Sequence, residues 1–214
     1  MFWDILNGDQ RRVLEKILKN MPLPGSYLAG GTALALILGH RESIDFDWFV
    51  REDFDPEELE YLLSKIGQLK TIETKKGTYH GFLDGVRVTW LRYPNPLIEP
   101  LISEKDFYGL LLPSITDIAL MKLAAVSHRG AKKDFIDLYS ICRTGISIEY
   151  LMDLLPRKFP DADINYYHMV KSLSYFDDAE REQMPIMRIQ LVWEDVKEFF
   201  LDAQNNLVRK YIQS

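Results

Sequence analysis

The spacing of apolar residues divides the chain into a first half that mixes helices with strands and a second half that is mostly helical. Apolar residues at helical spacing predict helices, and alternation of apolar with polar residues predicts strands. In the first half these patterns predict helices over 11–19, 33–38 and 56–66, and strands over 26–29, 44–50, 69–74, 78–83 and 86–92. Asp84-Gly85 joins the last two strands and is typical of a tight hairpin.

Three prolines end this mixed pattern, because Pro94, Pro96 and Pro100 interrupt any regular element. Beyond them the pattern predicts a helix whose apolar positions run over 118–126 and which continues to Gly130, and further helices over 132–142, 148–155, 164–173 and 193–211. We therefore expect an α+β fold in two domains: residues 1–100 with a small mixed or antiparallel sheet, and residues 101–214 as a helical bundle.

Composition and charge restrict the classes of protein that fit this pattern. The chain has 214 residues, 47% of them hydrophobic and 27% charged, as is typical of a folded globular protein. Its net charge is −6, so a site for a polyanion has to be local. Cys142 is the single cysteine, and we recognise neither a secretion signal nor an apolar stretch of the ~20 residues that span a bilayer. We expect a cytoplasmic protein that does not contact a membrane.

Two carboxylates occur two residues apart in the strand predicted over 44–50. Successive side chains in a strand alternate faces, so Asp45 and Asp47 share one face, roughly 6 to 7 Å apart, while Ile44, Phe46 and Trp48 share the other. Carboxylate oxygens are the ligands that Mg²⁺ prefers, and metal ions of this kind assist phosphoryl transfer. The alternative is the solvated acidic face of an edge strand.

A glycine-rich turn precedes the helix predicted over 33–38. Gly30-Gly31-Thr32 lies between a predicted strand and a predicted helix, where free backbone N–H groups and the helix dipole favour a phosphate. The alternative is that close packing of strand against helix requires the glycines.

A second cluster of charged residues lies in the predicted helical half. Lys122 and Arg129 are seven residues apart and share one helix face, which suits phosphates. Asp134 and Asp137 share a face of the next helix, where Lys133 can pair with Asp137. The alternative is a set of surface salt bridges, and the same pattern interprets Asp117 as part of a capping box rather than as a catalytic group.

The two clusters together resemble a known family. The segments 28–34 (LAGGTAL) and 40–47 (HRESIDFD) resemble the first motif of the polymerase-β-like nucleotidyltransferases and, within them, the AbiEii/AbiGii toxin family. The segment 117–138 is similar to later motifs of the same family, and the resemblance extends over residues 27–138. It implies a polymerase-β-like nucleotidyltransferase domain, an NTP substrate, Mg²⁺ as cofactor, and release of pyrophosphate when a nucleotide is transferred to an acceptor hydroxyl.

The resemblance also implies residue roles. It implies catalytic roles for Asp45, Asp47, Lys122, Asp134 and Asp137, with Mg²⁺ held by Asp45 and Asp47. It implies nucleotide contacts for Gly30, Gly31, Thr32, Arg41, Ser43, Lys122 and Arg129. The acceptor implied is tRNA or another RNA, with an antitoxin protein as partner.

One position departs from the family pattern. Many polymerase-β-like enzymes carry a third carboxylate on a later strand, but the strand predicted over 86–92 contains none, and Thr89 cannot replace a carboxylate as a strong metal ligand. Two alternatives to RNA modification therefore stay open. One is a nucleotide- or partner-binding module with impaired chemistry, and the other is a transferase that modifies protein.

Overall fold

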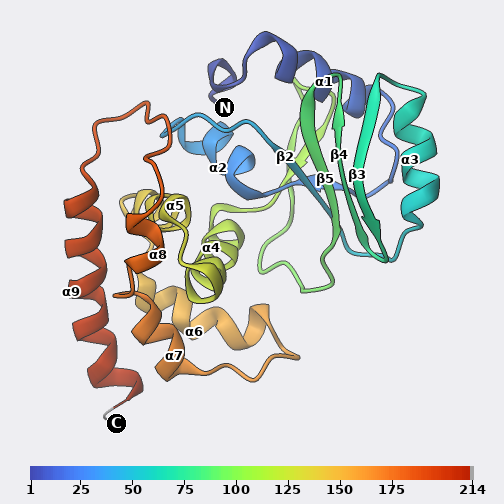
Figure 1. Cartoon of the computed structure of the whole chain (residues 1–214). Coiled ribbons are helices and arrows are strands. Elements are labelled where there is room, and N and C mark those ends of the chain that lie inside the picture. Colours follow the sequence, from blue (N-terminus) through green and yellow to red (C-terminus); the bar gives the residue numbers. More distant parts are fainter. Residues whose placement is uncertain (213–214) are drawn as a thin grey trace. The chain divides into compact units, whose positions relative to one another are not determined.

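The computed structural model describes residues 1–212 and divides the chain into two compact units (Figure 1). The first unit is Met1–Ser114, and the second begins at Ile115. No helix among the described residues is long and apolar enough to cross a membrane.

The first unit is built on a five-stranded mixed sheet. Its strands are β1 (Tyr27–Leu28), β2 (Phe46–Val50), β3 (Leu69–Lys75), β4 (Thr78–Leu83) and β5 (Val86–Arg92). They are ordered β1-β2-β5-β4-β3, with β2 and β5 parallel and the other neighbours antiparallel. The helical elements are η1 (Trp3–Ile5), α1 (Gly8–Lys19), α2 (Gly30–Leu38) and α3 (Pro56–Ser64). The expected α+β fold with a small mixed sheet is confirmed.

Local chemistry explains how these elements begin and end. The side chains and backbone N–H groups of Asn7 and Gln10 bond reciprocally in a capping box at the start of α1. Asp84 and Gly85 both have positive φ, at 48° and 82°, as the predicted hairpin turn between β4 and β5 requires. Both of those strands have their predicted bounds.

One face of the sheet forms the core of this unit. Trp48 on β2 and Trp90 on β5 are fully buried and stack with ring centroids 5.6 Å apart. Helices α1 and α3 contact the strands β5, β4 and β3. The opposite face carries Asp47, His80 and Thr89, and we return to it below.

Three predictions about the first unit need correction. The strand predicted over 44–50 begins at Phe46, the first residue paired with β5, so Asp45 lies just before the strand and Ile44 is 69% exposed instead of sharing the buried face of Phe46 and Trp48. The helix predicted over 33–38 begins at Gly30, so the glycines form its first turn. The segment after the prolines contains an unpredicted hairpin of β6 (Ile102–Glu104) and β7 (Leu110–Leu112), which belongs to the first unit because β7 packs against β1.

The second unit consists of helices. Their bounds are α4 (Ile115–Arg129), α5 (Lys132–Cys142), α6 (Ile148–Lys158), α7 (Tyr166–Ser172), α8 (Asp177–Glu180) and α9 (Trp193–Tyr211). Helices α5 and α9 have their predicted bounds. An aromatic cluster packs α5 and α9 together, with the buried ring of Phe135 5.2 Å from Phe200 and 6.1 Å from Trp193 between centroids.

Candidate active site

The N-terminus of α2 in the first unit is shaped by two glycines. Gly30 has φ +64°, and a Cβ there would lie 2.5 Å from Oδ2 of Asp47. The Asp47 carboxylate can therefore lie against the helix start only because residue 30 has no side chain. Ala29, the N-cap residue, has no side chain that could accept from the first N–H groups of the helix. This helix start combines a close carboxylate with backbone donors suited to an anion.

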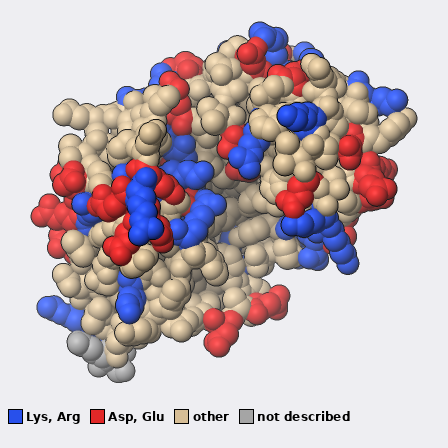
Figure 2. All heavy atoms as spheres, in the orientation of Figure 1, with Lys and Arg blue, Asp and Glu red and all other residues tan. Residues whose placement is uncertain are grey.

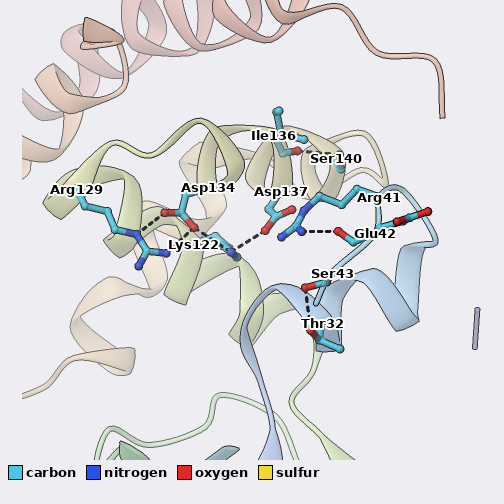
Figure 3. A network of polar contacts seen from close by, with 10 residues as sticks. All are labelled: Thr32, Arg41, Glu42, Ser43, Lys122, Arg129, Asp134, Ile136, Asp137 and Ser140. Atoms are coloured by element: carbon cyan, nitrogen blue, oxygen red, sulfur yellow. Dashed lines mark hydrogen bonds and ion pairs between the residues drawn. The ribbon is translucent and has the colours of Figure 1, made fainter. Parts of the chain in front are cut away.

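Arg41 and two hydroxyl groups complete this first cluster. A Cβ on Gly31 would overlap the guanidinium group of Arg41. Arg41 is only 5% exposed, and its Nη1 donates to the carbonyl of Glu42 at 2.9 Å (Figure 3). The Thr32 hydroxyl donates to Oγ of Ser43 at 2.8 Å and also contacts the carbonyl oxygen of Asp45. These contacts tie the segment before β2 to the first turn of α2. The structure thus brings the predicted residues of the first unit together at one helix end.

Asp45 and Asp47 form the carboxylate pair of this cluster. Both are half-buried, Asp47 within β2 and Asp45 immediately before it. Asp45 also lines a cavity of about 420 Å³ beside the sheet. Two neighbouring carboxylates next to a helix start with free backbone donors fit one Mg²⁺, because this ion takes one or two carboxylates and completes its shell with substrate phosphate and water. The donor chemistry therefore fits the implied cofactor.

The position of the third carboxylate is occupied by a threonine. Thr89 on β5 is in register with Asp47 and only 4% exposed. Within residues 1–212 there is no group of three His, Cys, Asp or Glu side chains that could hold a metal ion. A metal held here would depend on two protein carboxylates and on the substrate.

The second cluster, in the second unit, is a buried ion-pair network (Figure 3). Nζ of Lys122 on α4 lies 2.9 Å from Oδ1 of Asp134 and 2.6 Å from Oδ2 of Asp137, both on α5. Arg129 bonds both oxygens of Asp134, with Nε 2.6 Å and Nη2 3.0 Å away. Both aspartates are fully buried, whereas the Arg129 side chain is 57% exposed.

Burial and charge act in opposite directions on this network. Burial disfavours the charged form of Lys122, but the carboxylates of Asp137 and Asp134 outweigh it and raise the pKa of the lysine. Burial likewise disfavours the Asp134 carboxylate, but Lys122 and Arg129 outweigh it and lower its pKa. Lys122 and Asp134 therefore both stay charged near neutral pH.

These contacts correct the interpretation of the second cluster as surface salt bridges. Asp137 is bonded by Lys122 from the neighbouring helix, whereas the prediction paired it with Lys133 on its own helix. Lys132, the neighbour of Lys133 in the sequence, is also buried and donates to the carbonyl of Glu182 at 2.7 Å. Lys122 and Lys132 are therefore both committed to contacts within the protein.

One buried pair escaped the sequence analysis. Nζ of Lys158 on α6 lies 2.7 Å from Oδ1 of Asp117 on α4, and both side chains are fully buried. Burial lowers the pKa of Lys158, against the influence of Asp117. Asp117 is therefore an internal ion-pair partner and not an exposed carboxylate at a helix start. No periodicity or motif links two residues that lie so far apart along the chain, so only the packing of α6 against α4 reveals the pair.

The distribution of charge limits what a polyanion could contact. On the face drawn in Figure 2, basic and acidic side chains are interspersed. Lys75 near the end of β3 is exposed, but it is paired with Glu73. On this face, contacts with a long polyanion would therefore depend on small groups of cations and not on one continuous basic surface.

Comparisons with known proteins find one matching family model and one relative. The family model described as nucleotidyl transferase AbiEii toxin of type IV toxin–antitoxin systems matches residues 13–96 and 83–212. An uncharacterized protein of Aquifex aeolicus (strain VF5) is 35% identical over 212 residues, which cover 98% of each chain.

Two solved structures share the fold. The antibiotic-resistance factor ANT(2″)-Ia superposes with a TM-score of 0.54 at 16% identity, over 70% of this chain and 91% of that chain. A candidate nucleotidyltransferase from H. pylori superposes with a TM-score of 0.54 at 15% identity, over 94% of this chain and 92% of that chain. At these identities the likeness shows the fold alone, which is that of the polymerase-β-like nucleotidyltransferases.

Proposed function

The chain belongs to the AbiEii nucleotidyltransferase toxin family, and from this premise we propose that it transfers a nucleotide from an NTP to a hydroxyl of an RNA acceptor, with Mg²⁺ as cofactor. Nucleotidyl transfer itself follows from the family. The acceptor, tRNA or another RNA, the antitoxin partner and the role of each residue are parts of the proposal.

The observation that carries the proposal is the helix start of α2. There Gly30 admits the Asp47 carboxylate and Gly31 admits the Arg41 guanidinium, so a cation site and an anion site are neighbours. We assign the NTP phosphates to the first N–H groups of α2, with Thr32, Ser43 and Arg41 as supporting contacts. Arrangements of this kind suit phosphoryl transfer, whose catalysis consists mostly of positioning and neutralisation of charge.

Asp45 and Asp47 would hold the metal. When bound, Mg²⁺ supplies neutralisation of the phosphate charge. The protein's own contribution is to hold the triphosphate at the helix start and to fix both carboxylates, Asp47 through its strand and Asp45 through the contact of its carbonyl with Thr32. The acceptor oxygen then forms a bond to the α-phosphorus, and the bond from that phosphorus to pyrophosphate breaks.

We propose that the buried network of the second unit supports activity by holding its carboxylates in place, and that Lys122 does not bind phosphate itself. Lys122 is committed to Asp134 and Asp137, so we propose that it acts by holding these carboxylates ionised and in place. Arg129, whose side chain is largely exposed, is the better candidate for a contact with nucleotide phosphate.

The test is a transfer assay with α-labelled NTPs, Mg²⁺ and total cellular RNA. The variant Asp47→Asn keeps the shape of the side chain but loses its charge, and we expect transfer to fall at least a hundredfold with unchanged thermal unfolding, since metal charge stabilisation contributes several kcal/mol. Asp53→Asn is the matched control, because Asp53 lies in the exposed loop after β2 and pairs with Arg92. Full activity of Asp47→Asn would refute the metal assignment.

The same assay separates the alternatives. Label in RNA from the wild type alone supports the proposal and identifies the nucleotide. Label that resists nuclease but is lost with protease indicates a transferase that modifies protein. Nucleotide binding without label in either product would favour a binding module. Thr89 supports this alternative, because a threonine beside Asp47 supplies no third carboxylate for a metal.

A further inference from the structure

A row of polar side chains crosses four strands on the face of the sheet that carries Asp47. Asp47 on β2 is in register with Thr89 on β5, Thr89 with His80 on β4, and His80 with Glu73 on β3. Residues in register have their side chains on the same face of a sheet, so these four lie side by side. The row begins at a proposed metal ligand and reaches a histidine two strands away.

His80 is anchored in this row by a hydrogen bond. Its Nδ1 lies 3.1 Å from Oγ1 of Thr89. The histidine is half-buried. Thr89 is only 4% exposed, which fixes its hydroxyl under the ring. When Nδ1 carries the hydrogen and donates to Thr89, the lone pair of Nε2 is left to accept a proton. Among the side chains of the row, imidazole is the one suited to exchange a proton near neutral pH.

A cavity adjoins the row. Three of its lining residues, Asp45, Phe82 and Arg87, each lie two residues along the chain from a member of the row, namely Asp47, His80 and Thr89. Side chains two apart in a strand share a face, so Phe82 lies on the face of His80 and Arg87 on the face of Thr89, whereas Asp45 lies just before β2. The cavity's volume of about 420 Å³ suits the end of an acceptor molecule.

We propose that the acceptor enters this cavity and that Nε2 of His80 accepts the proton of its attacking hydroxyl, with Thr89 as the residue that positions the imidazole. The role rests on the proposed nucleotidyl transfer. The acceptor O–H bond breaks as its oxygen bonds the α-phosphorus, the proton moves to Nε2, and pyrophosphate leaves with the electrons of the broken P–O bond. The imidazolium then returns the proton to solvent. His80 thereby supplies a proton acceptor on a sheet that lacks the third carboxylate, and neither His80 nor Thr89 replaces that carboxylate as a metal ligand.

The charges that face His80 are consistent with this role. On this face of the sheet they are Asp47 on β2, Arg87 on β5, and Lys70, Glu73 and Lys75 on β3. Glu73 is directly beside the histidine, and its pairing with Lys75 lowers the pKa of its carboxyl group. The Glu73 carboxylate therefore lies beside the ring on which positive charge develops during transfer.

The test combines His80→Asn with Thr89→Val and Thr89→Ser in single-turnover transfer measured from pH 5.5 to 9. His80→Asn keeps an amide for Thr89 but has no basic nitrogen, so we expect the plateau rate to fall about 100- to 10,000-fold and the acidic limb of the wild-type profile to disappear. NTP binding in the presence of Mg²⁺ should be unchanged. Thr89→Val should lower the rate with the limb retained, and Thr89→Ser should restore it. His168→Asn, an exposed histidine of the second unit, is the matched control.

A second readout does not depend on activity. The ¹⁵N shifts of the His80 ring should show the Nδ1–H tautomer in the wild type and a mixture of tautomers in Thr89→Val. If His80→Asn transfers at the wild-type rate and keeps the acidic limb of the pH profile, the role of His80 as proton acceptor is overturned while the proposed function stands. If His80→Asn loses NTP binding as much as it loses transfer, His80 is structural and the role is overturned as well. A wild type that transfers nothing would refute the proposed function together with this step.

Discussion

Replacement of Lys122 by methionine tests the buried network of the second unit most directly. Methionine keeps an unbranched apolar side chain but removes the ammonium group that lies 2.9 Å from Asp134 and 2.6 Å from Asp137. Removal of one partner of a buried ion pair leaves charge uncompensated and costs about 3–5 kcal/mol of unfolding free energy. Arg129 still bonds both oxygens of Asp134, so the charge of this carboxylate stays partly compensated in the variant.

The pH dependence gives the sign of the effect. In the wild type the pKa of Asp134 is lowered, so its contribution to stability is present above the unfolded pKa and is lost as pH falls through the folded one. The pKa of Lys122 is raised, so its contribution is present below its ordinary value of 10.5 and is lost as pH rises through the folded value. In Lys122→Met burial dominates, and the carboxyl groups should take up protons well above pH 4. The difference from wild type should therefore be largest near pH 7 and smaller at pH 5.

Urea unfolding at both pH values, together with amide hydrogen exchange of residues 115–142, measures this difference. Lys133→Met is the matched control, because Lys133 is an exposed lysine of α5, the helix that carries Asp134 and Asp137, and its effect should stay within about 0.5 kcal/mol. A loss below about 1 kcal/mol in Lys122→Met at pH 7 would refute the reasoning from buried charge. So would a loss that is as large at pH 5 as at pH 7.

Two further predictions concern a glycine and the cysteine. Gly30→Ala should lower the free energy of unfolding by about 1–2 kcal/mol because of its φ of +64°, and it should abolish transfer because the new Cβ displaces the Asp47 carboxylate. Gly25→Ala is the control, since Gly25 has φ +82° and no atom within 4 Å of a Cβ. It should lower the free energy of unfolding by as much but leave transfer intact. Burial raises the pKa of the Cys142 thiol to about 12, so alkylation at pH 8 should be at least a hundredfold slower in the native protein than in urea and should still increase with pH above 9. Equal alkylation rates in the two states would contradict that environment.

Several features of the fold could be predicted from the sequence because their hydrogen bonds join residues close along the chain. The bounds of β4, β5, α5 and α9 agree with the predicted ones, and Asp84-Gly85 forms the turn that its composition favours. The motif around Gly30 and Asp47 likewise identified the family, since its residues are near one another in sequence. Periodicity failed at the edges of this motif, where tertiary contacts of Thr32 and Ser43 decide that β2 begins at Phe46.

The sequence by itself determined the local elements, the glycine turn and the carboxylate pair, because each depends on the chemistry and spacing of neighbouring residues. The tertiary structure alone decided that β2 runs parallel to β5, which places Thr89 beside Asp47 and His80 beside Thr89. It also decided that Lys122 is buried between two carboxylates. Such pairings join residues from different elements. They form because strands need partners for their backbone groups and because buried charges need counterions. Neither requirement can be recognised from the pattern of neighbouring residues.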